Sequence, residues 1–200
     1  MTKSAPARPA ELSDRATLNC TIGVLKKHFD LTAAGYLCQT DDVWQVVVTA
    51  AARRSTIEAT CADLLGAPAS NTVRGYLRDG CPPSAIPALQ TQCNAALASQ
   101  LPEWLRAHPR EVACDLHDVP YYGHQQPQDP ARPQDDPDYW ICRGEARAGT
   151  TRFYRCATAY IMRDGVRIDL EACLVQPGDT MTAVLQDLLA RVQTLGLTIR

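Results

Sequence analysis

The spacing of the apolar residues changes once along the chain, near Pro109, and this change limits the folds that the chain can adopt. Between Asp42 and Arg106, apolar residues recur at the spacing of amphipathic helices. After Pro109, three segments rich in Val, Ile, Thr and Tyr are typical of strands, at 111–119, 150–162 and 166–175. The sequence therefore predicts an α+β or α/β chain, with a helical region at 15–108 and a sheet-containing region at 109–200.

Two segments carry no regular pattern. Residues 1–14 contain Pro and Ala without periodicity and are expected to form a disordered lead-in. A Pro-rich stretch at about 124–138 is expected to be a long, disordered surface loop. The N-terminus lacks the apolar stretch of a signal peptide and no long apolar run follows, which predicts a cytoplasmic protein without a membrane partner. The nine cysteines form no CxxC pair, so a zinc ribbon is not expected.

The order of elements in the second region is informative. Arg163-Asp164-Gly165 predicts a tight hairpin turn between the second and third strands. A helix is expected over 181–195, ended by Gly196, and residues 197–200 have the composition of a starting strand. Three antiparallel strands followed by a helix and a strand parallel to the first are the first part of a ribonuclease H-like fold.

The helical region contains a helix pair with a short turn. Ser55 and Glu58 have the spacing of a capping box that starts a helix running to about Leu65. Gly66-Ala67-Pro68 then forms a turn, and Ser70 or Asn71 caps a second helix. Such a pair is common in all-helical domains, but it also places a recognition helix in the major groove of DNA. On the DNA-binding interpretation, the residues at base edges are Asn71, Thr72 and Arg74, and those at phosphates are Arg53, Arg54 and Arg78.

Asp115 interrupts an apolar strand. A carboxylate on a central strand is costly unless it is paired, hydrogen-bonded or bound to a metal. Hard cations such as Mg²⁺ bind carboxylate oxygens, so Asp115 is a candidate metal ligand. The alternative is an ordinary residue at a strand end or a sheet edge.

Four motifs together resemble the DDE transposases of bacterial and archaeal insertion sequences. They are CDLHDVPYYG at 114–123, RGEARAGT at 143–150, TRFYRCATAY at 151–160 and VQPGD at 175–179. The resemblance covers roughly residues 110–200 closely, and 42–106 only as a helical DNA-binding region. It implies a polynucleotidyl transferase that uses two Mg²⁺ or Mn²⁺ ions held by Asp, Asp and Glu.

The resemblance also implies roles for particular residues. Asp115 takes the position of the first catalytic, metal-binding Asp, whereas Asp118 is assigned to loop structure. The second Asp would follow the strand that starts at Leu197, and the Glu would lie further on, so neither is present before Arg200. The chain is expected to be inactive alone, to bind transposon-end DNA, and to need a second polypeptide or reading frame to complete the core; a homo-oligomer is open. The residues expected to follow the DNA backbone are Arg143, Arg147, Arg152 and Arg155.

A net charge of -2 is unlike that of a generally basic nucleic-acid binder, so any DNA contact must come from local clusters. Two alternatives therefore stay open. One is a helix-turn-helix transcriptional regulator with a small α/β sensor domain, which needs no metal. The other is a structural or immunity-like interaction protein without affinity for DNA.

Overall fold

The structure is a computed structural model that describes residues 13–124 and 131–200. The chain divides into two compact units, Met1–Gly80 and Cys81–Arg200, which we describe separately. The division lies earlier than the change of pattern near Pro109, because residues 81–108 pack with the sheet. Most of the predicted lead-in lies outside the described residues, but Asp14 is the first residue of a helix and Ser13 is its N-cap, with the Ser13 hydroxyl accepting a hydrogen bond from the Ala16 amide. No described helix has the length and apolar character needed to cross a membrane.

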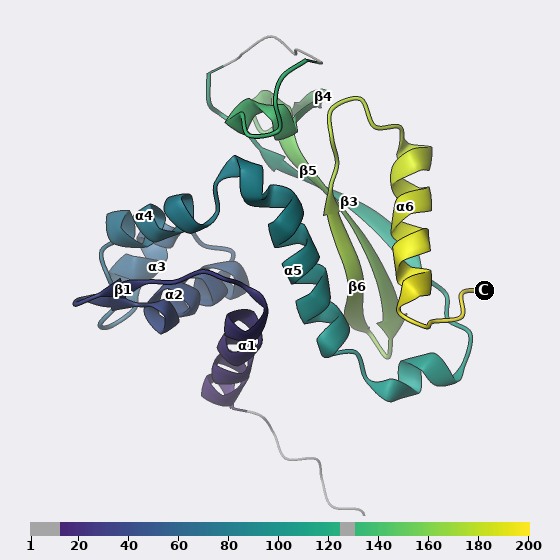
Figure 1. Cartoon of the computed structure of the whole chain (residues 1–200), viewed down its shortest axis with the longest axis horizontal. Coiled ribbons are helices and arrows are strands. Elements are labelled where there is room, and N and C mark those ends of the chain that lie inside the picture. Colours follow the sequence, from purple (N-terminus) through teal and green to yellow (C-terminus); the bar gives the residue numbers. More distant parts are fainter. Residues whose placement is uncertain (1–12, 125–130) are drawn as a thin grey trace, which may run out of the picture. The chain divides into compact units, whose positions relative to one another are not determined.

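The first unit consists of four helices and a short hairpin (Figure 1). Its elements in order are α1 (Asp14–His28), β1 (Ala34–Gly35), β2 (Cys38–Gln39), α2 (Thr40–Arg53), α3 (Ile57–Asp63) and α4 (Ser70–Gly80). Gln39 and Asp42 form a capping box at the start of α2. The core buries apolar side chains from α1, α2, α4 and the segment before the hairpin: Ile22, Leu31, Val43, Trp44, Val46 and Val73.

The predicted capping box of Ser55 and Glu58 is wrong. Thr56 caps α3 instead, and its hydroxyl accepts a hydrogen bond from the Ala59 amide at 3.1 Å. The helix starts one residue later than a Ser55 cap requires, because the Ser55 amide is already bonded to the Ala50 carbonyl at the end of α2. The Glu58 carboxylate is therefore free of the cap and pairs with Arg74.

The second unit is built around a four-stranded antiparallel sheet, so the α+β class is confirmed. Its elements are η1 (Pro83–Ala85), α5 (Ile86–Ser99), η2 (Glu103–Ala107), β3 (Ala113–Pro120), η3 (Pro137–Trp140), β4 (Ile141–Arg147), β5 (Thr150–Arg163), β6 (Val166–Leu174) and α6 (Met181–Thr194). Strand β5 is central, with β3 on one edge and with β6 and β4 following each other on the other edge. The predicted hairpin between β5 and β6 is present, with Asp164 and Gly165 at φ of 51° and 78°.

Two helices flank the sheet (Figure 1). Helix α5 covers the outer edge of β6, where the Asn94 side chain accepts from the Ala172 amide and donates to the Ala172 carbonyl, both at 2.9 Å. Helix α6 packs against β5 and β6 and places Val184, Leu188 and Val192 in the core. The side-chain amide of Asn94 thus takes the place of a neighbouring strand at an edge that would otherwise be open.

The chain returns to the sheet after α6. Arg110, just before β3, forms a parallel bridge with Ile199. The Arg110 amide donates to the Thr198 carbonyl at 2.8 Å, and the Arg200 amide donates to the Arg110 carbonyl at 3.0 Å. The predicted fourth strand is therefore present as a single parallel bridge beside the line of β3.

The segment between β3 and β5 differs from the prediction. Residues 141–147, where no strand is predicted, form strand β4, and the turn that follows consists of Ala148 and Gly149, which both have positive φ. Of the predicted loop at 124–138, residues 125–130 lie outside the described residues, and Pro137 already belongs to η3. Strand β4 pairs with the first residues of β5, from Ile141 opposite Tyr154 to Arg147 opposite Thr150.

Candidate nucleic-acid interface and carboxylate site

Helix α4 presents polar residues around one buried anchor. Val73 is fully buried in the first unit, whereas Asn71, Thr72 and Arg78 are exposed. The turn between α3 and α4 is allowed by Gly66, whose φ of 79° a side chain would oppose. Because buried Val73 anchors α4 in the core of the first unit, the backbone that carries the exposed side chains at the start of α4 is held in place.

The other predicted DNA contacts of this unit are also exposed. Arg53 ends α2, and Arg54 follows in the left-handed region at φ of 51°. Arg74 is exposed too, but its guanidinium lies 3.2 Å from the Glu58 carboxylate. A solvent-exposed pair of this kind contributes little free energy, so Arg74 can exchange Glu58 for a phosphate at small cost.

The four arginines expected to follow the DNA backbone divide into two kinds. Arg143 and Arg147, both on β4, are exposed. Arg152 is only 9% exposed, and Arg155 makes hydrogen bonds of 2.7 and 3.1 Å to the two carboxylate oxygens of Asp118. Arg143 and Arg147 can therefore reach a ligand at the surface, although Arg147 also lies 3.8 Å from the Asp118 carboxylate. Arg152 and Arg155 are largely buried within the unit.

The assignment of Asp118 to loop structure is wrong. Asp118 lies inside β3, opposite Arg155 on β5, and its side chain is 13% exposed. The hydrogen bond from Arg155 lowers the pKa of the Asp118 carboxyl; burial opposes this, and the charges of Arg155 and Arg147 add to it. This largely buried carboxylate on β3 is tolerated because it is paired.

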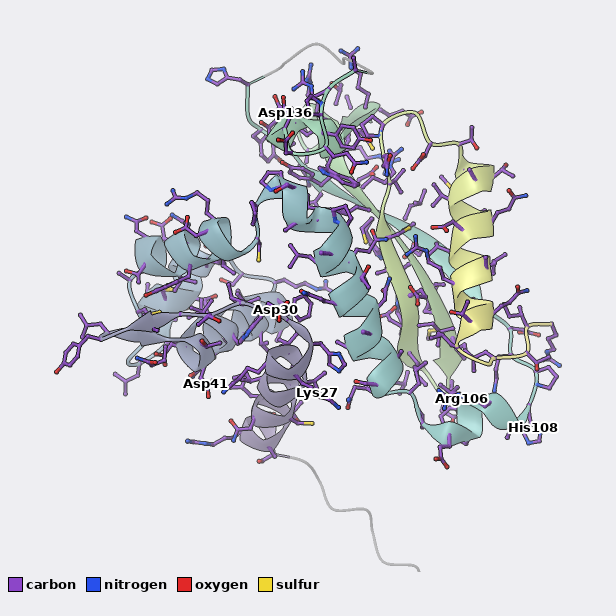
Figure 2. All side chains as sticks on the ribbon, viewed as in Figure 1. Lys27, Asp30, Asp41, Arg106, His108 and Asp136 are labelled. Carbon is purple, nitrogen blue, oxygen red and sulfur yellow. The ribbon has the colours of Figure 1, made fainter. Side chains whose placement is uncertain are left out.

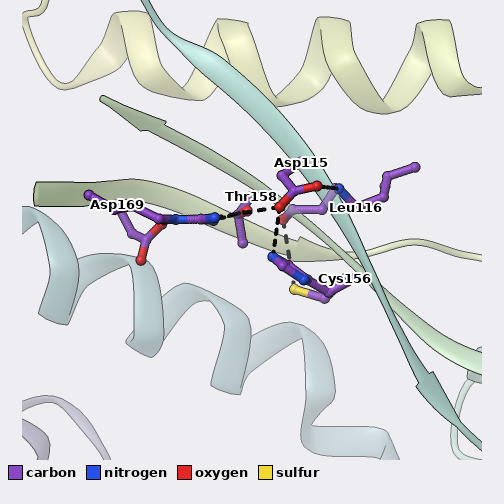
Figure 3. A network of polar contacts seen from close by, with 8 residues as sticks. Asp115, Leu116, Cys156, Thr158 and Asp169 are labelled. Atoms are coloured by element: carbon purple, nitrogen blue, oxygen red, sulfur yellow. Dashed lines mark hydrogen bonds and ion pairs between the residues drawn. The ribbon is translucent and has the colours of Figure 1, made fainter. Parts of the chain in front are cut away.

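Asp115 lies in a different polar network, which joins β3 to β6 (Figure 3). Its Oδ1 accepts from the Leu116 amide at 2.8 Å, and its Oδ2 lies 3.1 Å from His117 Nε2 and 3.5 Å from Arg167 Nη1. Arg167 also donates to Asp169 Oδ1 at 2.7 Å and to Thr158 Oγ1 at 2.6 Å. The guanidinium lies over the Tyr160 ring, 3.8 Å from its centroid. Arg167 is therefore the shared counter-ion of two carboxylates.

The residues in this network do not by themselves fit a two-metal centre. Over the described ranges, no group of three or more His, Cys, Asp or Glu side chains is arranged to hold a metal ion. The guanidinium of Arg167 pairs with both Asp115 and Asp169, so these two carboxylates already share one positive charge. Any Mg²⁺ or Mn²⁺ bound at Asp115 would need further ligands from outside the described residues.

Arg167 and Asp169 are missed by the sequence analysis, although a signal for them exists. They alternate on one strand, two residues apart, so they share a face of β6. To predict that this face lies beside Asp115, one must know how β3, β5 and β6 are aligned. That alignment includes an irregularity between Ala159 and Tyr160 for which the sequence gives no signal.

Comparison with protein-family models, with curated proteins and with solved structures finds no match to this chain. The functional assignment therefore rests on the sequence motifs and on the geometry of the two units.

Proposed function

We propose that this chain binds DNA as the N-terminal part of a DDE transposase, with a helix-turn-helix unit followed by the first part of a ribonuclease H-like core. The observation that carries the proposal is the parallel bridge between Arg110 and Ile199. In the chain it follows strands β3, β5 and β6, which are antiparallel neighbours in that order, and then helix α6. The first half of the ribonuclease H-like fold has this sequence of elements, with its next strand parallel to the first.

Asp115 is the first carboxylate of the proposed core. A strand continuing past Ile199 in the same register would reach the level of Asp115 after about five residues. A carboxylate at that point would lie on the strand next to Asp115. We propose that the missing ligands come from such a strand and from a later segment, and that the chain without them binds DNA but does not cleave it.

The first unit supplies duplex recognition in this proposal. Exposed Asn71 and Thr72 lie at the start of α4, where the recognition helix of a helix-turn-helix contacts base edges. Arg53, Arg54 and Arg78 are exposed cations that can contact phosphates. Their small number fits modest, salt-sensitive affinity from a chain with a net charge of -2.

Fluorescence anisotropy with a labelled 30-bp duplex of mixed sequence tests this proposal, with a series of salt concentrations. We expect Arg78→Ala to weaken binding and to reduce the slope of log K against log salt by about 0.9, the value for one lost phosphate contact. Arg191→Ala is the matched control, because Arg191 is an exposed arginine of α6 whose partner is Asp187 on the same helix. Absence of salt-dependent binding to the duplex would contradict the proposal and favour the interaction protein.

A transcriptional regulator is the second candidate, and the pairing of Asp115 with Arg167 favours it, because a sensor domain needs no metal. The two candidates differ in what Asp115 does. In the regulator, Asp115→Asn changes only local stability. In the transposase, the same change also abolishes DNA cleavage once the remaining core segments are supplied as a second polypeptide.

A further inference from the structure

A basic pocket with an aromatic wall lies at the end of the second unit where the β5–β6 hairpin meets the segment before β3. Its volume is about 520 Å³, and its lining includes Trp104, His108, Arg110, Arg163 and Arg200. Arg106, labelled with His108 in Figure 2, lies at the same end of the unit. None of these residues takes part in the Asp115 network or in the helix-turn-helix.

The aromatic wall is a stack of one indole and two guanidinium groups. The Arg163 guanidinium lies 3.9 Å from the Trp104 ring centroid, and that of Arg110 lies 5.1 Å from it. Trp104 is 36% exposed, whereas Trp44 and Trp140 are 6% and 3% exposed. Half of the Arg163 side chain is exposed as well, so a planar cationic surface faces solvent.

The stack is held in place before any ligand arrives. Arg110 donates to the Trp104 carbonyl at 2.8 Å and to the Leu105 carbonyl at 3.3 Å. Leu105 is fully buried, which anchors η2 in the core of the unit. A platform ordered in the free protein loses little conformational entropy when it binds a ligand.

The surrounding charge suits an anion. Arg163 and Arg200 have acidic neighbours, Asp164 at 3.4 Å and Glu111 at 2.9 Å, but both pairs are exposed and therefore weak. Each guanidinium carries five N–H donors, and these pairs use one of them. The remaining N–H groups of Arg163 and Arg200 can therefore donate hydrogen bonds to a phosphate beside the stack.

We propose that this pocket binds an unstacked nucleotide of single-stranded DNA, with its base on the Trp104 and Arg163 stack and a phosphate at Arg200. This inference rests on the proposed function in that it takes DNA as the ligand. A base paired inside a duplex is stacked on both faces and cannot stack on Trp104 and Arg163, and a free phosphate has no ring that could stack on them. Unpaired bases stack on aromatic rings and on arginine planes without regard to sequence.

The pocket lies close to Asp115 along the chain. Arg110 lines the pocket and lies five residues before Asp115, roughly 17 Å along an extended backbone. A single strand that leaves Trp104 along β3 would reach Asp115 within a few nucleotides. The pocket would hold a frayed DNA end beside the first carboxylate of the proposed core.

The test uses the full chain and a labelled 12-nucleotide thymidine oligomer. We expect the oligomer to quench tryptophan fluorescence, because Trp104 is the exposed tryptophan. Trp104→Ala and Arg163→Ala should each weaken binding about tenfold, whereas Trp104→Phe, which keeps an aromatic face, should retain most of the affinity. Arg191→Ala is the control for loss of one exposed arginine.

The outcomes separate this inference from the proposed function. Loss of oligomer binding in Trp104→Ala with normal duplex binding supports the pocket, and retained oligomer binding in both Trp104→Ala and Arg163→Ala overturns it. Equal quenching by inorganic phosphate alone also overturns it, because a simple anion site needs no stacked base. Arg78→Ala should bind the oligomer as the unchanged protein does. Oligomer binding without any duplex binding would overturn the helix-turn-helix proposal alone.

Discussion

Two carboxylates in the second unit, Asp118 and Glu171, have opposite electrostatic surroundings. Asp118 is paired with Arg155, which lowers the pKa of its carboxyl. Glu171 is 6% exposed, one of its oxygens has no hydrogen-bond partner in the described structure, and burial raises its pKa. Their protonation therefore changes the free energy of unfolding in opposite directions as pH changes.

Removing the partner of Asp118 should destabilise the second unit. In Arg155→Met a largely buried carboxylate loses its counter-ion, and we expect a loss of roughly 2 kcal/mol at pH 7. The stability that Asp118 contributes is present above its unfolded pKa of 3.8 and is lost as pH falls through its lowered folded pKa. Urea unfolding between pH 2 and pH 7 measures both effects. An Arg155→Met protein with the same acid dependence as the unchanged protein would contradict this account, and Arg143→Met, at an exposed position of β4, serves as the control.

For Glu171 we expect the opposite dependence of stability on pH. The folded state holds its proton to higher pH than the unfolded state, so stability falls as pH rises from about 4.5 to the raised pKa. Glu171→Gln cannot ionise and should remove this fall. Urea unfolding at pH 4, 6 and 8 checks the prediction, which fails if the unchanged protein and the variant lose stability in parallel.

At the scale of elements, the edge of β6 depends on two side chains of α5. Asn94 makes two hydrogen bonds to Ala172, and Gln90 accepts from the Leu174 amide. We expect Asn94→Ala to cost about 2 kcal/mol, because it leaves a strand amide and carbonyl without partners, and to increase aggregation through the freed edge. Thr91→Ala, at an exposed position of the same helix, is the control. Chemical unfolding and light scattering would show the difference, and equal behaviour of the two variants would refute the role of Asn94.

Local patterns predicted some elements well. Strands β3, β5 and β6, the Asp164-Gly165 hairpin and helix α6 follow from periodicity and turn chemistry. Strand β4 was not predicted, because RGEAR is polar and its strand character comes from pairing with the start of β5. Helix α1 falls within the predicted helical region at 15–108, whereas the β1–β2 hairpin inside that region is not predicted, because its strands have only two residues each.

The candidate sites depend still more on non-local placement. The exposure of Asn71 and Thr72 beside buried Val73 follows from helical spacing alone. The contact of Asp115 with Arg167 and that of Trp104 with Arg163 each join residues more than fifty positions apart. Sequence spacing cannot supply such contacts, because they are set by strand register and by the packing of η2.

At the scale of the whole molecule, the outer edge of β3 is the open part of the sheet. Within the described residues, β3 pairs only with β5, and Ile199 meets the chain at Arg110 before the strand begins. Val119, 56% exposed on β3, adds apolar surface there. We expect Val119→Lys to reduce association between copies, because a charge at an open edge opposes strand addition. Sedimentation velocity over a range of concentrations tests this, and unchanged association would show that the edge is not involved.

The central claim is that β3, β5, β6 and α6 are the first part of a larger catalytic core in which Asp115 is the first carboxylate. Determining the nucleotide sequence that follows the Arg200 codon, and translating all three frames, tests it most directly. The account predicts a hydrophobic strand with an Asp about five residues past Ile199, followed later by a helix carrying a Glu. A downstream sequence without such a strand in any frame would contradict the claim and leave a DNA-binding regulator or an interaction protein.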